Sequence, residues 1–140
     1  MNIILPGDKD YESRPSVQRK SLRINLNENI YGTFVEIGAG QEVARNFYRV
    51  GAASGTIAKS MSAYDKSFSD SIYGKEENGR YVTQNRLDKM LEHEMNLLEK
   101  RISRDKNPDK FFFVYANTVA TIDFVKKFGI SLFSKALGGS

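Results

Sequence analysis

The 140-residue sequence contains no cysteine and no tryptophan, and it has one histidine and three prolines. Without cysteine the chain cannot form disulfides, thiolate metal sites or a thiol nucleophile, and nothing argues for an oxidising compartment. A single histidine without cysteine also argues against a transition-metal site. No closely spaced series of aspartates of the kind that binds Ca²⁺ or Mg²⁺ is present either. We therefore predict no metal centre, and no cofactor can be assigned.

Long hydrophobic runs are also missing. No window approaches the ~18–20 apolar residues that a membrane span requires. The N-terminal residues MNIILPGDKDYESRP carry only a short apolar stretch with no basic residues before it. That pattern is not typical of a secretory signal peptide. We expect a cytoplasmic protein that does not associate with a membrane.

Basic residues are in small excess over acidic residues. The chain has 21 basic and 17 acidic residues, a formal net charge of +4. With 40% hydrophobic and 27% charged residues, the composition is typical of a globular chain. Basic and acidic residues are interleaved along the sequence, whereas nucleic-acid binding usually shows a denser basic cluster. The interleaving therefore argues against a nucleic-acid partner.

Composition divides the chain into three parts. We expect residues 1–20, which are polar and contain two prolines, to form a mobile arm. Residues 21–128 are expected to form a single α/β domain, and residues 129–140 a tail that is either non-native or truncated. Within the domain, Leu22, Ile24 and Leu26 alternate with polar residues and favour a short strand.

The next segments have clearer periodicity. Alternating apolar and β-branched residues predict a strand over 31–37. After Gly40, apolar pairs four residues apart predict a short helix that ends at Gly51. A second helix is expected from an N-cap at Ser54 or Thr56 to a stop at Gly74. Its predicted apolar stripe consists of Ile57, Met61, Tyr64, Phe68 and Ile72.

The C-terminal half is predicted to hold one long helix and one buried strand. The helix extends over 83–104 and the strand over 111–115, while residues 118–127 fit either a strand or a helix. The order of elements indicates an α/β or α+β fold, a helix-rich single domain with a small sheet whose strands lie near 31–37 and 111–115. The long helix has an apolar stripe made of Leu87, Met90, Leu91, Met95, Leu98 and Ile102.

Two glycine-containing segments are the candidate binding residues. In the first, Gly38 and Gly40 follow the predicted strand, and Arg45 lies one turn into the helix after them. Glycines at such a turn allow backbone N–H groups to approach a phosphate. The alternative is a tight strand-to-helix turn with no ligand. The second segment begins a predicted helix with small residues, hydroxyls and a lysine, namely Ser54, Gly55, Thr56 and Lys59. Its alternative is close packing of two helices.

The sequence around the first turn, EIGAG at 36–40, resembles the first motif of Rossmann-like methyltransferases. The third glycine of that motif is absent here, and Glu42 occupies its place. No acidic residue is evident at the end of a second strand, where a methyltransferase would have one. A degenerate methyltransferase therefore stays an alternative hypothesis.

A broader resemblance covers residues 29–124. The stretches NIYGTFVEIGAGQEVARNFYRVGAASG, RYVTQNRLDKMLEHEMNLLEKRIS and FFFVYANTVATIDF are similar to the N-terminal part of a family of longer bacterial cytosolic proteins. The resemblance implies no activity and transfers no catalytic residue. Members of that family continue well past the position of Phe128, which implies that the strand at 111–115 lacks partners here. An unpaired strand edge would favour a homo-oligomer.

The leading hypothesis is a domain in which the two glycine-containing segments form one side of a nucleotide or phosphate site, with no reaction assigned. In this hypothesis backbone amides and Lys59 hold the anion, and Arg45 assists. The rival hypothesis is a non-catalytic interaction or assembly module, in which the long helix presents part of its apolar stripe to a partner.

Overall fold

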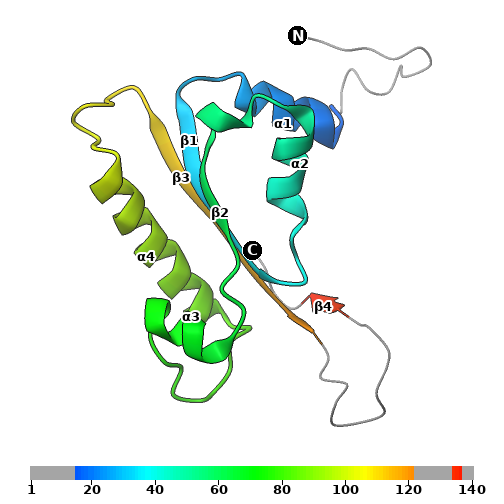
Figure 1. Cartoon of the computed structure of the whole chain (residues 1–140), viewed down its shortest axis with the longest axis vertical. Coiled ribbons are helices and arrows are strands. Elements are labelled where there is room, and N and C mark those ends of the chain that lie inside the picture. The colour runs from blue at the N-terminus through cyan, green and yellow to red at the C-terminus, as the bar shows by residue number, and fades with distance from the viewer. Residues whose placement is uncertain (1–14, 122–133, 137–140) are drawn as a thin grey trace.

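The computed structural model describes residues 15–121 and 134–136 and has an α/β fold, as predicted. Its elements in chain order are α1 (Val17–Asn25), β1 (Ile30–Gly38), α2 (Glu42–Val50), the 3₁₀ turn η2 (Ala53–Gly55), β2 (Ile57–Met61), α3 (Lys66–Tyr73), α4 (Gln84–Arg101), β3 (Phe111–Thr121) and β4 (Ser134–Ala136). Figure 1 shows the strands at the centre with helices around them. None of the helices in the described residues is long and apolar enough to cross a membrane.

The sheet has the strand order β2-β1-β3-β4. Strand β1 lies between β2 and β3 and is parallel to both, while β4 pairs antiparallel with the last residues of β3. From β1 the chain crosses to β2 on one side through α2, and then to β3 on the other side through α3 and α4. The direction of the connections therefore reverses at the carboxyl end of β1. In sheets wound this way, ligands bind at that reversal point.

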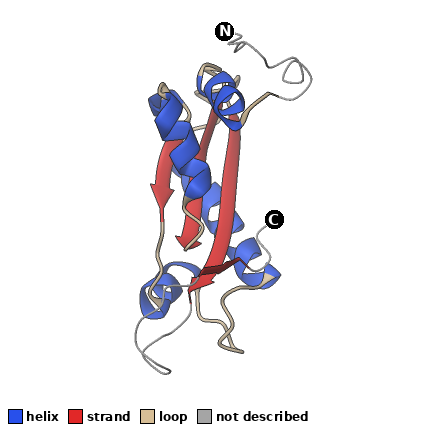
Figure 2. Cartoon of the chain, turned by 90° about the vertical axis from the view of Figure 1, so that its right-hand side faces the viewer, coloured by secondary structure: helices blue, strands red, loops and turns tan. Residues whose placement is uncertain are grey.

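Alternation along β1 divides the core into two layers. Val35 and Ile37 pack in one cluster with residues of α3 and α4, whereas Phe34 packs in a second cluster with residues of α2. Both faces of β1 are buried, which explains why its sequence is apolar at nearly every position. Figure 2, seen from the side, shows helices in front of and behind the long strand β3.

Several sequence predictions are confirmed. The strand at 31–37 is β1, and the strand at 111–115 is the start of β3, which runs on to Thr121. Helix α2 ends before Gly51, whose φ is +83°, and α4 begins after the N-cap Thr83. Residues 122–127 of the ambiguous segment, most of the N-terminal arm and nearly all of the tail lie outside the described residues.

The strand predicted around Leu22–Leu26 is wrong, because this segment belongs to helix α1. The Ser16 side chain accepts a hydrogen bond from the Arg19 N–H and caps the helix. The last four residues assigned to the N-terminal arm, 17–20, are the first turn of this helix. The helix also buries polar positions that no apolar pattern could reveal, since Ser21 and Asn25 face α2 and η2. The Asn25 amide donates to two carbonyls at the end of α2.

The single helix predicted from Ser54 or Thr56 to Gly74 is also wrong. Its first part is strand β2, and only residues 66–73 are helical. Helix α3 begins at Lys66 because the Asp65 carboxylate accepts a hydrogen bond from the Phe68 N–H. The apolar residues of the predicted stripe are consequently divided, with Ile57 in the core and Phe68 61% exposed.

The strand at 111–115 has a strand partner on one of its two edges within the described residues. Residues Phe111 to Val119 pair in parallel with Ile30 to Gly38 of β1 without interruption. On the other edge β4 pairs only with Val119, Ala120 and Thr121, and no other strand of the described residues covers residues 111–118 there. The homo-oligomer expected from an unpaired strand edge stays a prediction.

Candidate ligand-binding site

The glycine turn after β1 is a site of close packing against β3. Gly38 has a φ of +91°, and a Cβ atom added there would lie 1.8 Å from the carbonyl oxygen of Val119. A Cβ atom on Gly40 would lie 2.6 Å from the Val119 side chain. The Ala39 N–H donates to the same carbonyl at 3.2 Å. The close contacts with Val119 therefore explain why glycine is needed at both positions, without any ligand.

The N-terminus of α2 is already occupied by an anion of the protein itself. The carboxylate of Glu36, 2% exposed, accepts hydrogen bonds from the N–H groups of Val43 and Ala44, both at 3.0 Å. The Asn117 amide donates to the same carboxylate at 3.1 Å and to the Gly40 carbonyl at 3.0 Å. A phosphate bound at this helix start would have to displace Glu36.

The other helix starts are also capped by side chains. Ser16 caps α1, Asp65 caps α3 and Thr83 caps α4, each by accepting a hydrogen bond from an N–H in the first turn. Across the described residues, every α-helix N-terminus is therefore satisfied by a polar side chain of the chain itself. An anionic ligand would more readily meet a cationic side chain than these backbone groups.

The second group of predicted site residues lies at the opposite end of the sheet. Ser54 and Gly55 are exposed in η2, and Thr56 is fully buried just before β2. Gly32 pairs with Ile57 at this end. Gly38 is six residues further along β1, about 20 Å away at ~3.3 Å per residue. The two glycine-containing segments therefore do not form one site.

Lys59 is also placed apart from the glycine turn, because it pairs with Thr33 of β1. The Lys59 ammonium lies 2.5 Å from the Glu94 carboxylate of α4. Glu94, 1% exposed, also accepts a hydrogen bond from the Tyr73 hydroxyl at 3.0 Å. Burial, followed by the Glu94 charge, raises the pKa of Tyr73, so this hydroxyl stays a proton donor. Arg45 is exposed on α2.

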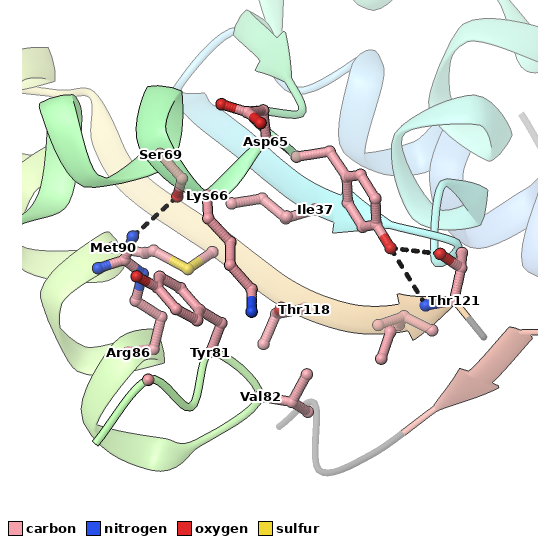
Figure 3. A pocket seen from close by; sticks show the side chains of 14 residues that line it. Ile37, Asp65, Lys66, Ser69, Tyr81, Val82, Arg86, Met90, Thr118 and Thr121 are labelled. Carbon is pink, nitrogen blue, oxygen red and sulfur yellow. Dashed lines mark hydrogen bonds between the residues drawn. The ribbon is translucent and has the colours of Figure 1, made fainter. Parts of the chain in front are cut away.

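A pocket of about 610 Å³ lies at the carboxyl ends of β1 and β3. Its walls come from the end of β1, the segment between β2 and α3, the start of α3, the segment before α4, the first turns of α4 and the last residues of β3 (Figure 3). It is thus at the reversal point of the sheet. The lining residues are Ile37, Tyr64, Asp65, Lys66, Ser69, Gly79, Tyr81, Val82, Arg86, Met90, Thr118, Val119, Ala120 and Thr121.

One wall of the pocket is fixed by the buried guanidinium of Arg86. This residue, 1% exposed, donates to Glu76 at 2.9 Å, to Ser69 at 2.9 Å and to Asp70 at 3.2 Å. It also donates to the Gly74 carbonyl. Two carboxylates therefore already balance its charge, and Arg86 holds the wall in place instead of offering a free cation.

Two cations lie close to the ring of Tyr81 at the same wall. The Arg86 guanidinium is 4.8 Å and the Lys66 ammonium 5.4 Å from the centre of its ring. The Tyr81 hydroxyl donates to Asp70 at 2.8 Å, a hydrogen bond that raises the pKa of Tyr81. Lys66 is exposed and makes no ion pair within the described part of the chain. It is the cation that a ligand in this pocket could reach.

The contribution of Glu76, a partner of Arg86 in this wall of the pocket, to the stability of the fold is expected to decrease in acid. The hydrogen bond from Lys89, with further hydrogen bonds from Asn85 and Arg86, lowers the pKa of Glu76 below its ordinary value of 4.5. A carboxyl whose pKa is lower in the folded state stabilises the fold above its unfolded pKa and loses that contribution as the pH falls through the folded pKa.

Urea unfolding should therefore show a stability that is constant from pH 7 to about 5 and falls below about pH 4.5. The Glu76→Gln variant is the control. Because its side chain does not titrate, it should start from a lower stability and lose less of it in acid. An equal acid-dependent loss in both proteins would contradict the assignment.

The sequence analysis missed the residues that organise this region. Arg86, Met90, Glu94 and Leu98 recur every four residues and share one buried side of α4. Two charged residues at such spacing among apolar ones were a signal of buried ion pairs. Likewise, Glu36 is a carboxylate in an otherwise apolar strand and could have been identified as buried.

Comparison with known proteins adds no functional information. No protein-family model, curated protein or solved structure matches the chain. Within residues 15–121 and 134–136, no group of three or more metal-ligating side chains is present. The resemblance to longer bacterial proteins stays a prediction.

Proposed function

We propose that this domain binds a small ligand of the nucleotide class in the pocket at the carboxyl ends of β1 and β3. The observation that carries the proposal is the position of the pocket. It lies where the connections of the parallel sheet reverse, which is where open α/β sheets bind their ligands. Its volume of about 610 Å³ is within the range of ligand pockets, roughly 300–1,000 Å³.

The chemistry of the walls supports this class. Tyr64 offers an aromatic surface to a planar base, and Ile37, Met90 and Val119 are apolar. The hydroxyls of the wall, from Ser69, Thr118 and Thr121, are suited to hydrogen bonds with a sugar. Such a mixture of apolar surface and a few polar groups is typical of small-molecule sites.

The charge of the walls favours a ligand of low negative charge. Lys66 is the one lining cation that no carboxylate neutralises in the described residues, because Arg86 is paired with Glu76 and Asp70. Asp65 is also in the lining and would repel a highly charged phosphate chain. A nucleoside monophosphate therefore fits the site better than a triphosphate.

Isothermal titration with AMP, ATP, NAD and S-adenosylmethionine tests the proposal. We expect AMP to bind, ATP to bind no more tightly, and Lys66→Met to weaken the binding of AMP about tenfold through loss of a charge-assisted contact. Filling the pocket with Ala120→Phe should abolish binding. The matched control is Lys100→Met, an exposed lysine in the last turn of α4, which should bind as the unmodified protein does. Equal weakening by both lysine variants, or no binding of any of these compounds, would contradict the proposal.

The two alternative functions have less support. Half of the apolar stripe of α4 is buried, namely Leu87, Met90 and Leu98. The other half, Leu91, Met95 and Ile102, is half-buried, so the stripe offers only a small apolar surface to a partner. For a methyltransferase, β2 ends at Met61 and is followed by Ser62 and Ala63, so it has no acidic residue at its end. No observation favours either alternative over the pocket.

A further inference from the structure

The excess positive charge of the chain is concentrated on two helices. Helices α1 and α2 together carry five basic residues and one acidic residue, a formal charge of +4. Outside these helices, basic and acidic residues are equal in number, sixteen of each. The net charge of +4 therefore comes from this pair. The five basic residues are Arg19, Lys20, Arg23, Arg45 and Arg49.

The two helices contact each other and lie on the same side of the sheet (Figure 1). The opposite face has no such excess, because α3 and α4 carry five basic and five acidic residues between them. Among the helices of the described residues, the basic excess is thus separated from the balanced charges of α3 and α4. Such a separation creates a positive potential over one face of the molecule.

Four of the five basic side chains of this face are free to meet an anion, and Arg19 is half-buried. Lys20, Arg23, Arg45 and Arg49 are exposed, and none of the five cations makes an ion pair within the described part of the chain. Arg23 and Arg49 lie in the last turns of their helices, where a cation interacts favourably with the helix dipole. Lys20 and Arg45 lie elsewhere and have no such structural reason.

An exposed aromatic ring lies on α2 beside two of these cations. Tyr48 is 54% exposed and adjoins Arg49 in sequence, one turn after Arg45. Four of the five cations are arginines, whose guanidinium groups bind phosphate in a bidentate manner. Arginines around an exposed aromatic ring are the combination with which proteins bind the phosphates and stack the bases of single strands.

We propose that the α1–α2 face, defined by Arg19, Lys20, Arg23, Arg45, Arg49 and Tyr48, binds single-stranded nucleic acid. An anionic membrane surface is the less favoured occupant, because the apolar side of α2, with Ala44 and Phe47, packs against the sheet and cannot enter a bilayer. The proposal concerns a different face from the ligand pocket and is independent of it.

Fluorescence anisotropy with labelled U20 and dT20 oligonucleotides, in a salt titration from about 50 to 200 mM, tests the proposal. We expect binding that weakens steeply with salt. The double variant Arg45→Gln/Arg49→Gln should bind about tenfold more weakly. Its slope of log K against log [salt] should be smaller by about 1.4, because each lost phosphate contact removes about 0.7 on a single strand. Tyr48→Ala should weaken binding without changing the slope, since stacking involves no counterions.

The matched control is Lys100→Gln/Arg101→Gln, which removes two exposed cations from the last turn of α4. This variant should bind the oligonucleotides as the unmodified protein does. All substituted residues are exposed, and circular dichroism should confirm that each variant is folded. The proposal is overturned if neither oligonucleotide binds at about 50 mM salt, or if the control loses as much affinity as the α2 variant. It is equally overturned if phosphatidylserine vesicles bind this face and the oligonucleotides do not.

Discussion

Replacement of Arg86 by methionine is expected to lower the free energy of unfolding by about 3–5 kcal/mol, the usual cost of removing one member of a buried ion pair. The guanidinium is 1% exposed and is the hydrogen-bond donor to Glu76, Ser69 and Asp70. Methionine fills a similar volume but donates nothing. The buried Glu76 would then retain only Lys89 and Asn85 as partners. Urea unfolding at pH 7, followed by circular dichroism, measures the change.

Two companion variants separate charge from geometry. Arg86→Lys keeps the charge but cannot reach all of these partners, so its loss should be intermediate. Arg104→Met removes the exposed ion pair with Glu99 and should change the free energy of unfolding by less than about 1 kcal/mol. A loss of less than about 1 kcal/mol for Arg86→Met would show that the buried network does not hold the fold together.

Gly38→Ala is expected to have the second largest effect on the free energy of unfolding. Gly38→Ala places a Cβ atom 1.8 Å from the Val119 carbonyl oxygen, at a residue whose φ is +91°. The backbone strain costs about 1–2 kcal/mol, and the displacement of β3 needed to relieve the overlap adds about 1–3 kcal/mol. The same displacement would disturb the pocket, because Val119 lines it.

Gly74 supplies a matched control for this substitution. Its φ is +92°, almost the same as that of Gly38, yet a Cβ atom there has no neighbour within 4 Å. Gly74→Ala should therefore show only the backbone strain, about 1–2 kcal/mol. If the two variants lost the same stability in urea unfolding, the close approach of the turn to β3 would not be what requires glycine at position 38.

The secondary structure was predicted correctly for elements whose sequence pattern fits only one kind of element. Strand β1 is apolar and β-branched and ends in glycine, and α4 follows a threonine cap with apolar residues at helical spacing. The prediction of a helix around β2 was wrong because Ile57 and Met61 have helical spacing in the sequence. Pairing with β1, which the local sequence does not reveal, makes the segment a strand. Helix α1 was predicted as a strand for the reverse reason, since Leu22, Ile24 and Leu26 alternate with polar residues although the segment is helical.

The candidate site was harder to predict because it depends on distant residues. Glu36 is bound by Asn117, which is 81 positions away in the sequence. The pocket likewise combines β1 with the last residues of β3. The glycine turn was correctly located, but its two interpretations differ only in what lies opposite Gly38. That is the Val119 carbonyl, which no local pattern reveals.

A ¹H–¹⁵N NMR titration with AMP tests the location of the ligand site most directly. The account predicts shifts for the amides of Lys66, Tyr81 and Thr118, with little change at Val43 and Ala44, whose N–H groups stay bound to Glu36. The largest shifts at Val43 and Ala44, with none around the pocket, would contradict it. Such a result would mean that the ligand displaces Glu36 and that the start of α2 is the site.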